Sequence, residues 1–345
     1  MKYNNISILS FTIFTASTLL ANTVHIQVPT AISPPEVTVK VISPIKIHSD
    51  EKKIAPLNVN QNKTLNKAIG FSKRVPPDYK NINETIAPGI SPDNNISTVS
   101  AFLTFKIIPI EVIRENLKKN NFSILTEYKV DKKGLITSIV FTNKAITKNA
   151  SKNERGFAGT LRLLINKQSG IISITNPVYL MKAFLQEDYN NLLAQQTLKT
   201  LNNTFSNLEN SKDIVKYTKL DHYRYMDNMP YYQDMEVIAS GSNQKLLENA
   251  RKSKKVIYEH ILENGSVAIG IELSKRTRKF VKKIGYQNAG LLPYPILIEN
   301  NQAKTLAPQY YIALMYPMLN MTQFMSIASI PGAILKDCNR VFKDR

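Results

Sequence analysis

The chain has 345 residues, of which 43% are hydrophobic, and a formal net charge of +19. This length suits two domains of ordinary size, and the apolar fraction is enough for a packed core. The single cysteine, Cys338, excludes an intramolecular disulfide even in an oxidising compartment. The positive charge predicts attraction to anionic partners. The alternative is a compositional habit, because the basic residues are scattered through a chain rich in Lys, Asn and Ile.

The N-terminus resembles a secretory signal. Lys2 precedes an uncharged, mostly apolar run at residues 6–20, which ends in Leu19-Leu20-Ala21. This order of charged, apolar and cleavage-site segments is typical of a signal peptide. The run has about 15 residues, fewer than the roughly 20 that span a bilayer. We therefore expect an exported protein, periplasmic or secreted, that is cleaved near Ala21. The alternative is an uncleaved N-terminal anchor.

Residues 22–97 have the composition of a linker. They hold nine of the seventeen prolines, including Pro34-Pro35 and Pro76-Pro77, and several polar runs. A stretch at 36–42 alternates like a strand, but the segment otherwise lacks the apolar density of a core. We expect it to be largely disordered.

The pattern changes from Ser100 onwards, where alternating and apolar runs predict a first α/β unit over residues 98–188. Its strands are predicted at 101–108, 122–130, 135–142, 160–166 and 170–175. One helix is predicted from Pro109 to Asn120, and another from Asn176-Pro177 to about Asp188. Residues 189–232 follow with helically spaced leucines, which predict a helical connector.

The same order of elements recurs in residues 233–345. Strands are predicted at 235–240, 256–263, 267–273, 294–299 and 303–306. Helices are predicted at 243–252 and 275–284, and apolar helical material follows to the end. Asn264-Gly265 is a strong signal for a tight hairpin.

Several short matches between the two units, such as Glu127-Tyr128 with Glu259-His260, share an offset of 131 to 133 residues. The pattern predicts an α+β fold of two tandem, two-layer α/β units that are diverged copies. The alternative is chance similarity between two unrelated α/β domains.

Two short segments carry a resemblance to a known family. The stretch LLPYPILIENNQAKTLAP at residues 291–308 is similar to the ending of domain-of-unknown-function family 302, where a Leu-Pro step, a hydrophobic strand, an acidic turn and a second strand follow one another. The run from Ile174 to Pro177 resembles that family's Asn-Pro step before a helix, although here it follows the hairpin. Pro293-Tyr294 stands where the family has Pro-Cys. The resemblance implies a two-layer α/β fold and no established activity.

The densest functional-looking stretch is Leu220–Tyr232, which mixes charged groups with tyrosines. Flat aromatic faces beside directional polar groups suit the binding of a sugar or a peptide. The candidate ligand-binding residues are Asp221, His222, Tyr223, Arg224 and Tyr225. The alternative is an inter-unit hinge whose tyrosines only pack between the two copies.

A second candidate is the basic run at residues 274–283, which carries six positive charges. If helical, it turns Phe280, Val281 and Ile284 inward and presents cations outward, as an anion-binding or membrane-surface helix does. The candidate residues are Lys275, Arg276, Arg278 and Lys282. The alternative is a plain solvated face. Nucleic acid is not expected, because the run lacks interleaved exposed aromatics.

Other candidate groups favour structural roles. His260 is expected to be a half-buried strand residue, and with Glu263 it lacks a third ligand at zinc spacing. Glu127 and Glu259 occupy equivalent strand positions, but nothing in the sequence places them in one cleft. Cys338 lies on a predicted apolar helix face and is expected to be a small buried residue.

The sequence contains no nucleophile elbow, phosphate loop, metal-protease helix or haem attachment motif. The leading hypothesis is therefore a non-enzymatic exported protein, without cofactor or metal, that binds a small ligand or an anionic envelope component, with peripheral membrane contact as one form of this. One alternative is a hydrolase with an unrecognised site near His222. Another is a structural protein of the cell envelope.

Overall fold

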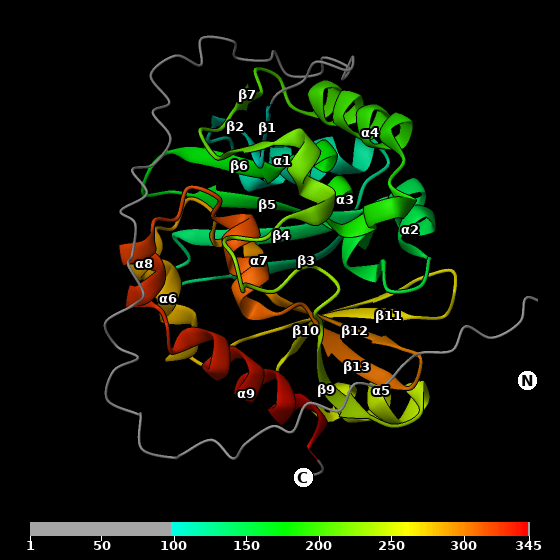
Figure 1. Cartoon of the computed structure of the whole chain (residues 1–345). Helices are drawn as coiled ribbons and strands as arrows, with labels where there is room; N and C mark the ends of the chain where they lie inside the picture. The colour runs from blue at the N-terminus through cyan, green and yellow to red at the C-terminus, as the bar shows by residue number, and fades with distance from the viewer. Residues whose placement is uncertain (1–97, 344–345) are drawn as a thin grey trace, which may run out of the picture. The chain divides into compact units, whose positions relative to one another are not determined.

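The computed structural model describes residues 98–343, so the predicted signal peptide and linker lie outside the described residues. The fold is α+β, as predicted: helices accompany two larger antiparallel sheets and one two-stranded sheet (Figure 1). The two larger sheets correspond to the two predicted α/β units. Each is described first by itself, and then by its contacts with the other.

The first sheet has six strands in the order β3-β4-β5-β6-β2-β7. Its five main strands are β2 (Phe102–Lys106), β3 (Ser123–Lys129), β4 (Ile136–Thr142), β5 (Leu161–Asn166) and β6 (Ile171–Thr175). The helices of this unit are α1 (Ile110–Lys119), α2 (Lys144–Ala150), the 3-10 helix η3 (Gly156–Gly159) and α3 (Pro177–Leu185). Helix α3 begins with Pro177 after Asn176, whose side chain accepts a hydrogen bond from the backbone N–H of Val178. The predicted start of α3 is confirmed, because an Asn cap followed by proline favours the first turn of a helix.

The second sheet has five strands in the order β10-β11-β12-β13-β9. They are β9 (Glu236–Ser240), β10 (Val256–Ile261), β11 (Val267–Ile271), β12 (Tyr294–Glu299) and β13 (Gln302–Thr305), and helix α5 (Asn243–Lys252) follows β9. The predicted hairpin at Asn264-Gly265 is confirmed. It joins β10 to β11, and Gly265 adopts a φ of +81°, which a residue with a side chain rarely adopts.

Apart from the short edge strand β7 (Glu209–Asn210) of the first sheet, the two sheets share one strand order. In each, the first strand in the chain, β2 or β9, pairs with the last of the shared strands, β6 or β13, while two hairpins form the rest. The second strand of each sheet also carries a bulge at an equivalent place. Leu125 in β3 and Ile257 in β10 are the extra residues, and each lies two positions before Glu127 or Glu259.

The two glutamates make the same kind of contact. Glu127 binds both nitrogens of the Arg114 fork on α1, at 2.6 and 2.7 Å, and Glu259 binds Arg251 on α5 in the same way, at 2.9 and 2.5 Å. Each carboxylate therefore ties a strand to the helix of its own unit, and the two do not form a catalytic pair with each other.

The segment between the units is α-helical only in its first part. Helix α4 spans Asn191–Thr204, and the chain then forms the short strands β7 (Glu209–Asn210) and β8 (Ile214–Lys216) and the 3-10 helix η5 (Tyr217–His222). Strand β7 extends the first sheet beside β2, and β8 pairs with β1 (Thr98–Ser100). The leucine spacing predicted the helix, whereas the strands depend on partners about 100 residues away in the chain.

The two units contact each other reciprocally. Strand β3 lies against β10, η3 lies against β11 and β12, and the 3-10 helix η7 (Ala289–Leu291) lies against β4 and β5. Arg162 of β5 extends across the interface, where its guanidinium donates hydrogen bonds to the carbonyls of Gly290, Leu291 and Pro293. The buried residues of both units form one hydrophobic core. Each unit thus completes the packing of the other.

The C-terminal part adds short helices. They are η6 (Thr277–Lys279), α6 (Phe280–Ile284), α7 (Pro308–Met315), α8 (Met321–Ser326) and α9 (Ile330–Phe342). Cys338 is fully buried on α9, and burial raises the pKa of its thiol, so it is a packing residue as predicted. Within residues 98–343, no helix is long and apolar enough to cross a membrane.

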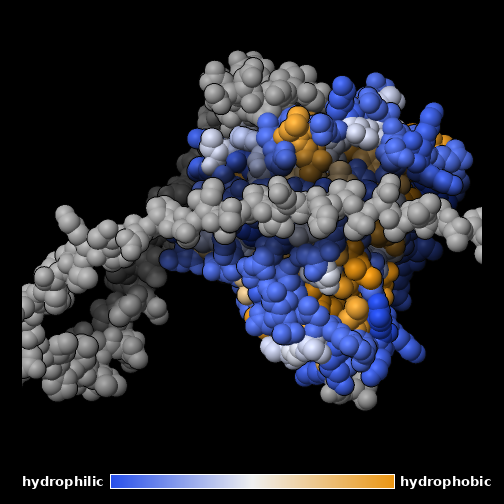
Figure 2. Space-filling view, turned by 90° about the vertical axis from the view of Figure 1, so that its right-hand side faces the viewer, coloured by the Kyte–Doolittle hydropathy of each residue, from blue (hydrophilic) through white to orange (hydrophobic). Residues whose placement is uncertain are grey.

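The surface shown in Figure 2 is mostly hydrophilic, but hydrophobic residues gather in its lower half, at the height where Figure 1 places the second sheet. Val237 on β9 and Ile261 on β10 are more than half exposed, at 51% and 59%. Both belong to the outer strands of that sheet. Exposed apolar side chains are common on soluble proteins, so neither residue by itself indicates a binding site.

Candidate functional site

Two of the predicted ligand-binding residues are packing residues. Tyr223 is buried, and its hydroxyl donates a hydrogen bond to the carbonyl of Ala313 at 3.0 Å. Tyr225 stacks on Phe324 with ring centroids 4.9 Å apart, and its hydroxyl donates to the carbonyl of Leu319 at 2.8 Å. Tyr223 is therefore closed to a ligand, and Tyr225 already uses its hydroxyl and one ring face for packing.

Asp221 and His222 do not form a catalytic dyad. Asp221 accepts a hydrogen bond from Lys182 at 2.9 Å through one oxygen, while its other oxygen is buried without a partner in the described structure. His222 ends η5 and is exposed, with no hydrogen bond or ion pair to any described residue. The imidazole therefore lacks the orienting carboxylate that a general base needs.

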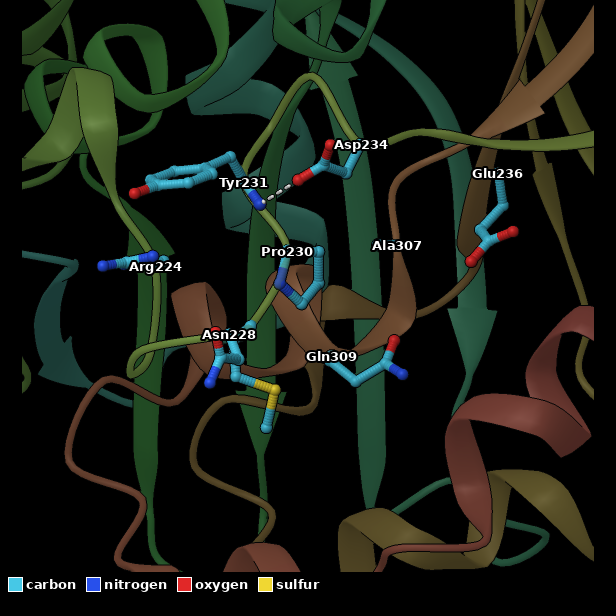
Figure 3. A pocket seen from close by; sticks show the side chains of 9 residues that line it. Arg224, Asn228, Pro230, Tyr231, Asp234, Glu236, Ala307 and Gln309 are labelled. Atoms are coloured by element: carbon cyan, nitrogen blue, oxygen red, sulfur yellow. Dashed lines mark hydrogen bonds between the residues drawn. The ribbon is translucent and has the colours of Figure 1, made fainter. Parts of the chain in front are cut away.

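Arg224 lines a pocket of about 460 Å³ (Figure 3). This volume falls within the range of small-molecule sites. The pocket brings together the end of the connecting segment, the start of β9 and the start of α7. Its lining residues are Arg224, Asn228, Met229, Pro230, Tyr231, Asp234, Glu236, Ala307 and Gln309.

Two of the three charged groups that line this pocket have polar partners, whereas the side chain of the exposed Glu236 forms no hydrogen bond or ion pair with a described residue. Arg224 pairs with Asp227 at 2.7 Å and lies over the ring of Tyr231, 5.0 Å from its centroid. Asp234 accepts a hydrogen bond from the backbone N–H of Tyr231 at 2.8 Å, drawn as the dashed line in Figure 3. The pocket therefore offers a polar surface, but no group poised for nucleophilic or acid/base chemistry.

The basic run is helical from Thr277, and Phe280, Val281 and Ile284 are buried as predicted. Among the candidate anion-binding residues, Lys275, Arg276 and Lys282 are exposed. Arg278 differs from the other three. Its side chain is only 16% exposed, and its guanidinium binds Glu272 at 2.5 Å and the hydroxyl of Tyr128 at 3.2 Å. Arg278 thus joins the two units instead of facing a ligand.

One cation of the first unit joins this group. Lys132, in the turn between β3 and β4, lies close enough to Lys275 to lower its pKa, and Lys279 adds to the effect. We call Lys132, Lys275, Arg276, Lys279 and Lys282 the basic face. All five side chains are exposed and form no ion pair with a described residue. Sequence reasoning missed Lys132, because only the contact between the units brings its turn next to residue 275.

His260 is a strand residue, as predicted, but it is buried at the interface and not half-buried. Its Nε2 shares a hydrogen bond of 3.1 Å with the hydroxyl of Thr147 on α2. Burial disfavours the charged imidazolium and lowers the pKa of His260 from its ordinary value of 6.5.

This lowered pKa predicts an acid sensitivity. As pH falls below 6.5, the unfolded chain binds the proton before the folded one does. Stability is therefore lost between pH 6.5 and the lower folded-state pKa. We expect His260→Gln to lose less stability than the wild type when urea unfolding at pH 5 is compared with pH 7.5. The exposed His222→Gln is the control. Equal losses in the wild type and His260→Gln would contradict this assignment.

Within the described part of the chain, no three His, Cys, Asp or Glu side chains are grouped so that they could hold a metal ion. Comparison of the chain with protein-family models, curated proteins and solved structures found no match. The geometry of the pocket and of the basic face is therefore what bears on function. The basic face gathers several cations that form no ion pair with a described residue, whereas in the pocket Glu236 is the one charged lining group without a side-chain partner among the described residues.

Proposed function

We propose that this is a non-enzymatic exported protein that binds an anionic component of the cell envelope through the basic face. The observation that carries the proposal is the convergence of exposed cations from both units without a carboxylate partner among the described residues. Like charges held together favour binding of an anion, which relieves their repulsion. The apolar run before Ala21 supports the export part of the proposal, and the Pro-rich residues 22–97 support a tether between envelope and fold.

We also propose that the two units are diverged copies of one α/β unit. The support is that cross-strand neighbours align the two units with nearly the same offset as the sequence matches. In the first sheet the neighbours are Glu127, Ile139 and Leu163, and in the second they are Glu259, Ile269 and Ile296, at offsets of 132, 130 and 133 residues. The reciprocal contacts of η3 and η7 also have the form of a two-fold interface between like subunits.

The test of the proposed function is binding to a soluble polyanion such as dextran sulfate. We expect Lys132→Glu/Lys275→Glu to bind at least about tenfold more weakly than the wild type, because each change removes an attraction and adds a repulsion. Wild-type binding should weaken steeply with salt and be lost above roughly 0.3 M, where exposed charges are screened over a few ångströms.

The matched control is Lys118→Glu/Lys119→Glu on α1, which changes the net charge equally at exposed lysines elsewhere in the first unit. We expect it to keep most of the affinity. If both double variants lose affinity equally, the attraction comes from the overall charge of the chain, and the basic face is not a site. Binding that survives in all variants at high salt would favour a non-electrostatic structural role in the envelope.

A further inference from the structure

Helix α8 and the turn before it present methionines to solvent. Met318 in the turn is 44% exposed, and Met321 and Met325, one turn apart on the helix, are 43% and 61% exposed. We call these three residues the methionine surface. Exposed apolar side chains that gather within one short segment, in contrast to scattered ones, mark a surface that meets a partner.

Buried contacts hold the methionine surface in place. Phe324 of α8 is buried and stacks on Tyr225, whose hydroxyl binds the carbonyl of Leu319 just before the helix. A capping box at Asn320 and Gln323 closes the first turn of α8. The exposed side chains are therefore carried on a supported helix, so little order has to be gained when they bind.

The methionine surface lies beside the cations of α6. Helices α6 and α8 are in contact and lie side by side in Figure 1. The ammonium group of Lys283 on α6 donates a hydrogen bond to the carbonyl of Ser326 at 3.2 Å. Lys279 and Lys282 on the same short segment are exposed. The chain contains no acidic residue at positions 273–298 or 300–336, which include both helices. Apolar and cationic side chains are thus neighbours on a surface whose own segments carry no negative charge.

We propose that the methionine surface and the neighbouring lysines dock on an anionic phospholipid bilayer, with the methionines entering the boundary between headgroups and acyl chains. This combination of an apolar face and flanking lysines is what an interfacial anchor requires. Met-rich surfaces also bind protein helices. Charge complementarity favours the bilayer here, because it presents a continuous sheet of negative charge next to apolar material. The proposal rests on the proposed function and names its anionic partner.

A tryptophan reporter tests the insertion directly, because the chain has no natural tryptophan. Met325→Trp should show a blue-shifted emission and quenching by brominated acyl chains when vesicles containing phosphatidylglycerol are added. The control is Leu192→Trp on α4, whose parent side chain is 67% exposed and which lies outside the proposed surface. No shift for Met325→Trp under conditions where the protein is bound to the vesicles, or the same shift at both positions, would overturn the proposal.

Co-sedimentation separates this proposal from the broader one. We expect the wild type to sediment with phosphatidylglycerol vesicles and not with pure phosphatidylcholine. Met321→Ser/Met325→Ser should bind the anionic vesicles roughly tenfold more weakly, through the lost apolar burial, while its affinity for dextran sulfate stays unchanged. Binding of the wild type to dextran sulfate but not to vesicles would overturn the bilayer proposal and leave the proposed function standing. Binding to neither would overturn both.

Discussion

Replacing Arg162 with methionine is expected to lower the free energy of unfolding by about 3–5 kcal/mol, because several buried acceptors lose their donor and each costs about 1–3 kcal/mol when it is left unpaired. The Arg162 side chain reaches the carbonyls of Gly290, Leu291 and Pro293 at 3.2, 3.0 and 2.8 Å, and the hydroxyl of Tyr258 at 3.4 Å. Methionine fills a similar volume but donates no hydrogen bond, so it leaves buried acceptors unpaired.

Urea unfolding measures this loss. The control is Arg114→Met, because the Arg114 side chain is 45% exposed and water can replace its partner Glu127. We expect little change for that variant. The free energy of unfolding of Arg162→Lys should lie between those of the wild type and of Arg162→Met, because an ammonium group keeps the charge but cannot reach all four acceptors. A loss below about 1 kcal/mol for Arg162→Met would mean that the carbonyls find other donors.

The second large effect is expected at Gly270. This residue lies opposite Tyr258 across β10 and β11, and a Cβ added at Gly270 would lie 2.0, 2.5 and 2.8 Å from three atoms of the Tyr258 ring. Gly270→Ala therefore forces a ring that is only 5% exposed out of its place. We expect a loss of about 1–3 kcal/mol of stability, as for other overpacked cores, measured by the same urea unfolding.

Gly332 provides a control, because its replacement by alanine is expected to raise the stability instead of lowering it. It lies in α9 with no heavy atom within 4 Å of an added Cβ, so Gly332→Ala should gain about 0.5–1 kcal/mol from the better helix propensity of alanine. The double variant Arg162→Met/Gly270→Ala should lose less than the sum of its single changes, because both disturb Tyr258. Strict additivity would show that Arg162 and the ring are not coupled.

Much of the local structure follows from short stretches of the chain. The hairpin at Asn264-Gly265, the start of α3 at Pro177 and the inward face of Phe280, Val281 and Ile284 were all predicted, because turn chemistry, caps and apolar spacing act between residues a few positions apart. The connecting segment at residues 189–232, which mixes helices and strands, was predicted least well. Its strands β7 and β8 need distant partners, and no local pattern indicates them.

The candidate site was only partly predictable. The aromatic residues near residue 222 suggested ligand binding, but Tyr223 and Tyr225 are used to pack the C-terminal helices. A tyrosine on a binding surface and a tyrosine in a core share one local sequence signature, since both pair an apolar ring with a hydrogen-bonding tip. Only the contacts of these rings with residues about 90 positions later distinguish the two uses.

Local patterns and composition are enough to predict the α+β class, the order of the main strands in the two units, the lack of an intramolecular disulfide and the strong positive charge. They do not indicate β7, β8 or α2. The same patterns predict export. Which charges act together depends on tertiary contacts. Lys132 meets Lys275, Arg278 turns inward to Glu272, and Arg162 crosses between the units. These contacts join residues on different elements, most of them more than 100 positions apart, whose approach depends on how the two sheets pack and not on any local pattern.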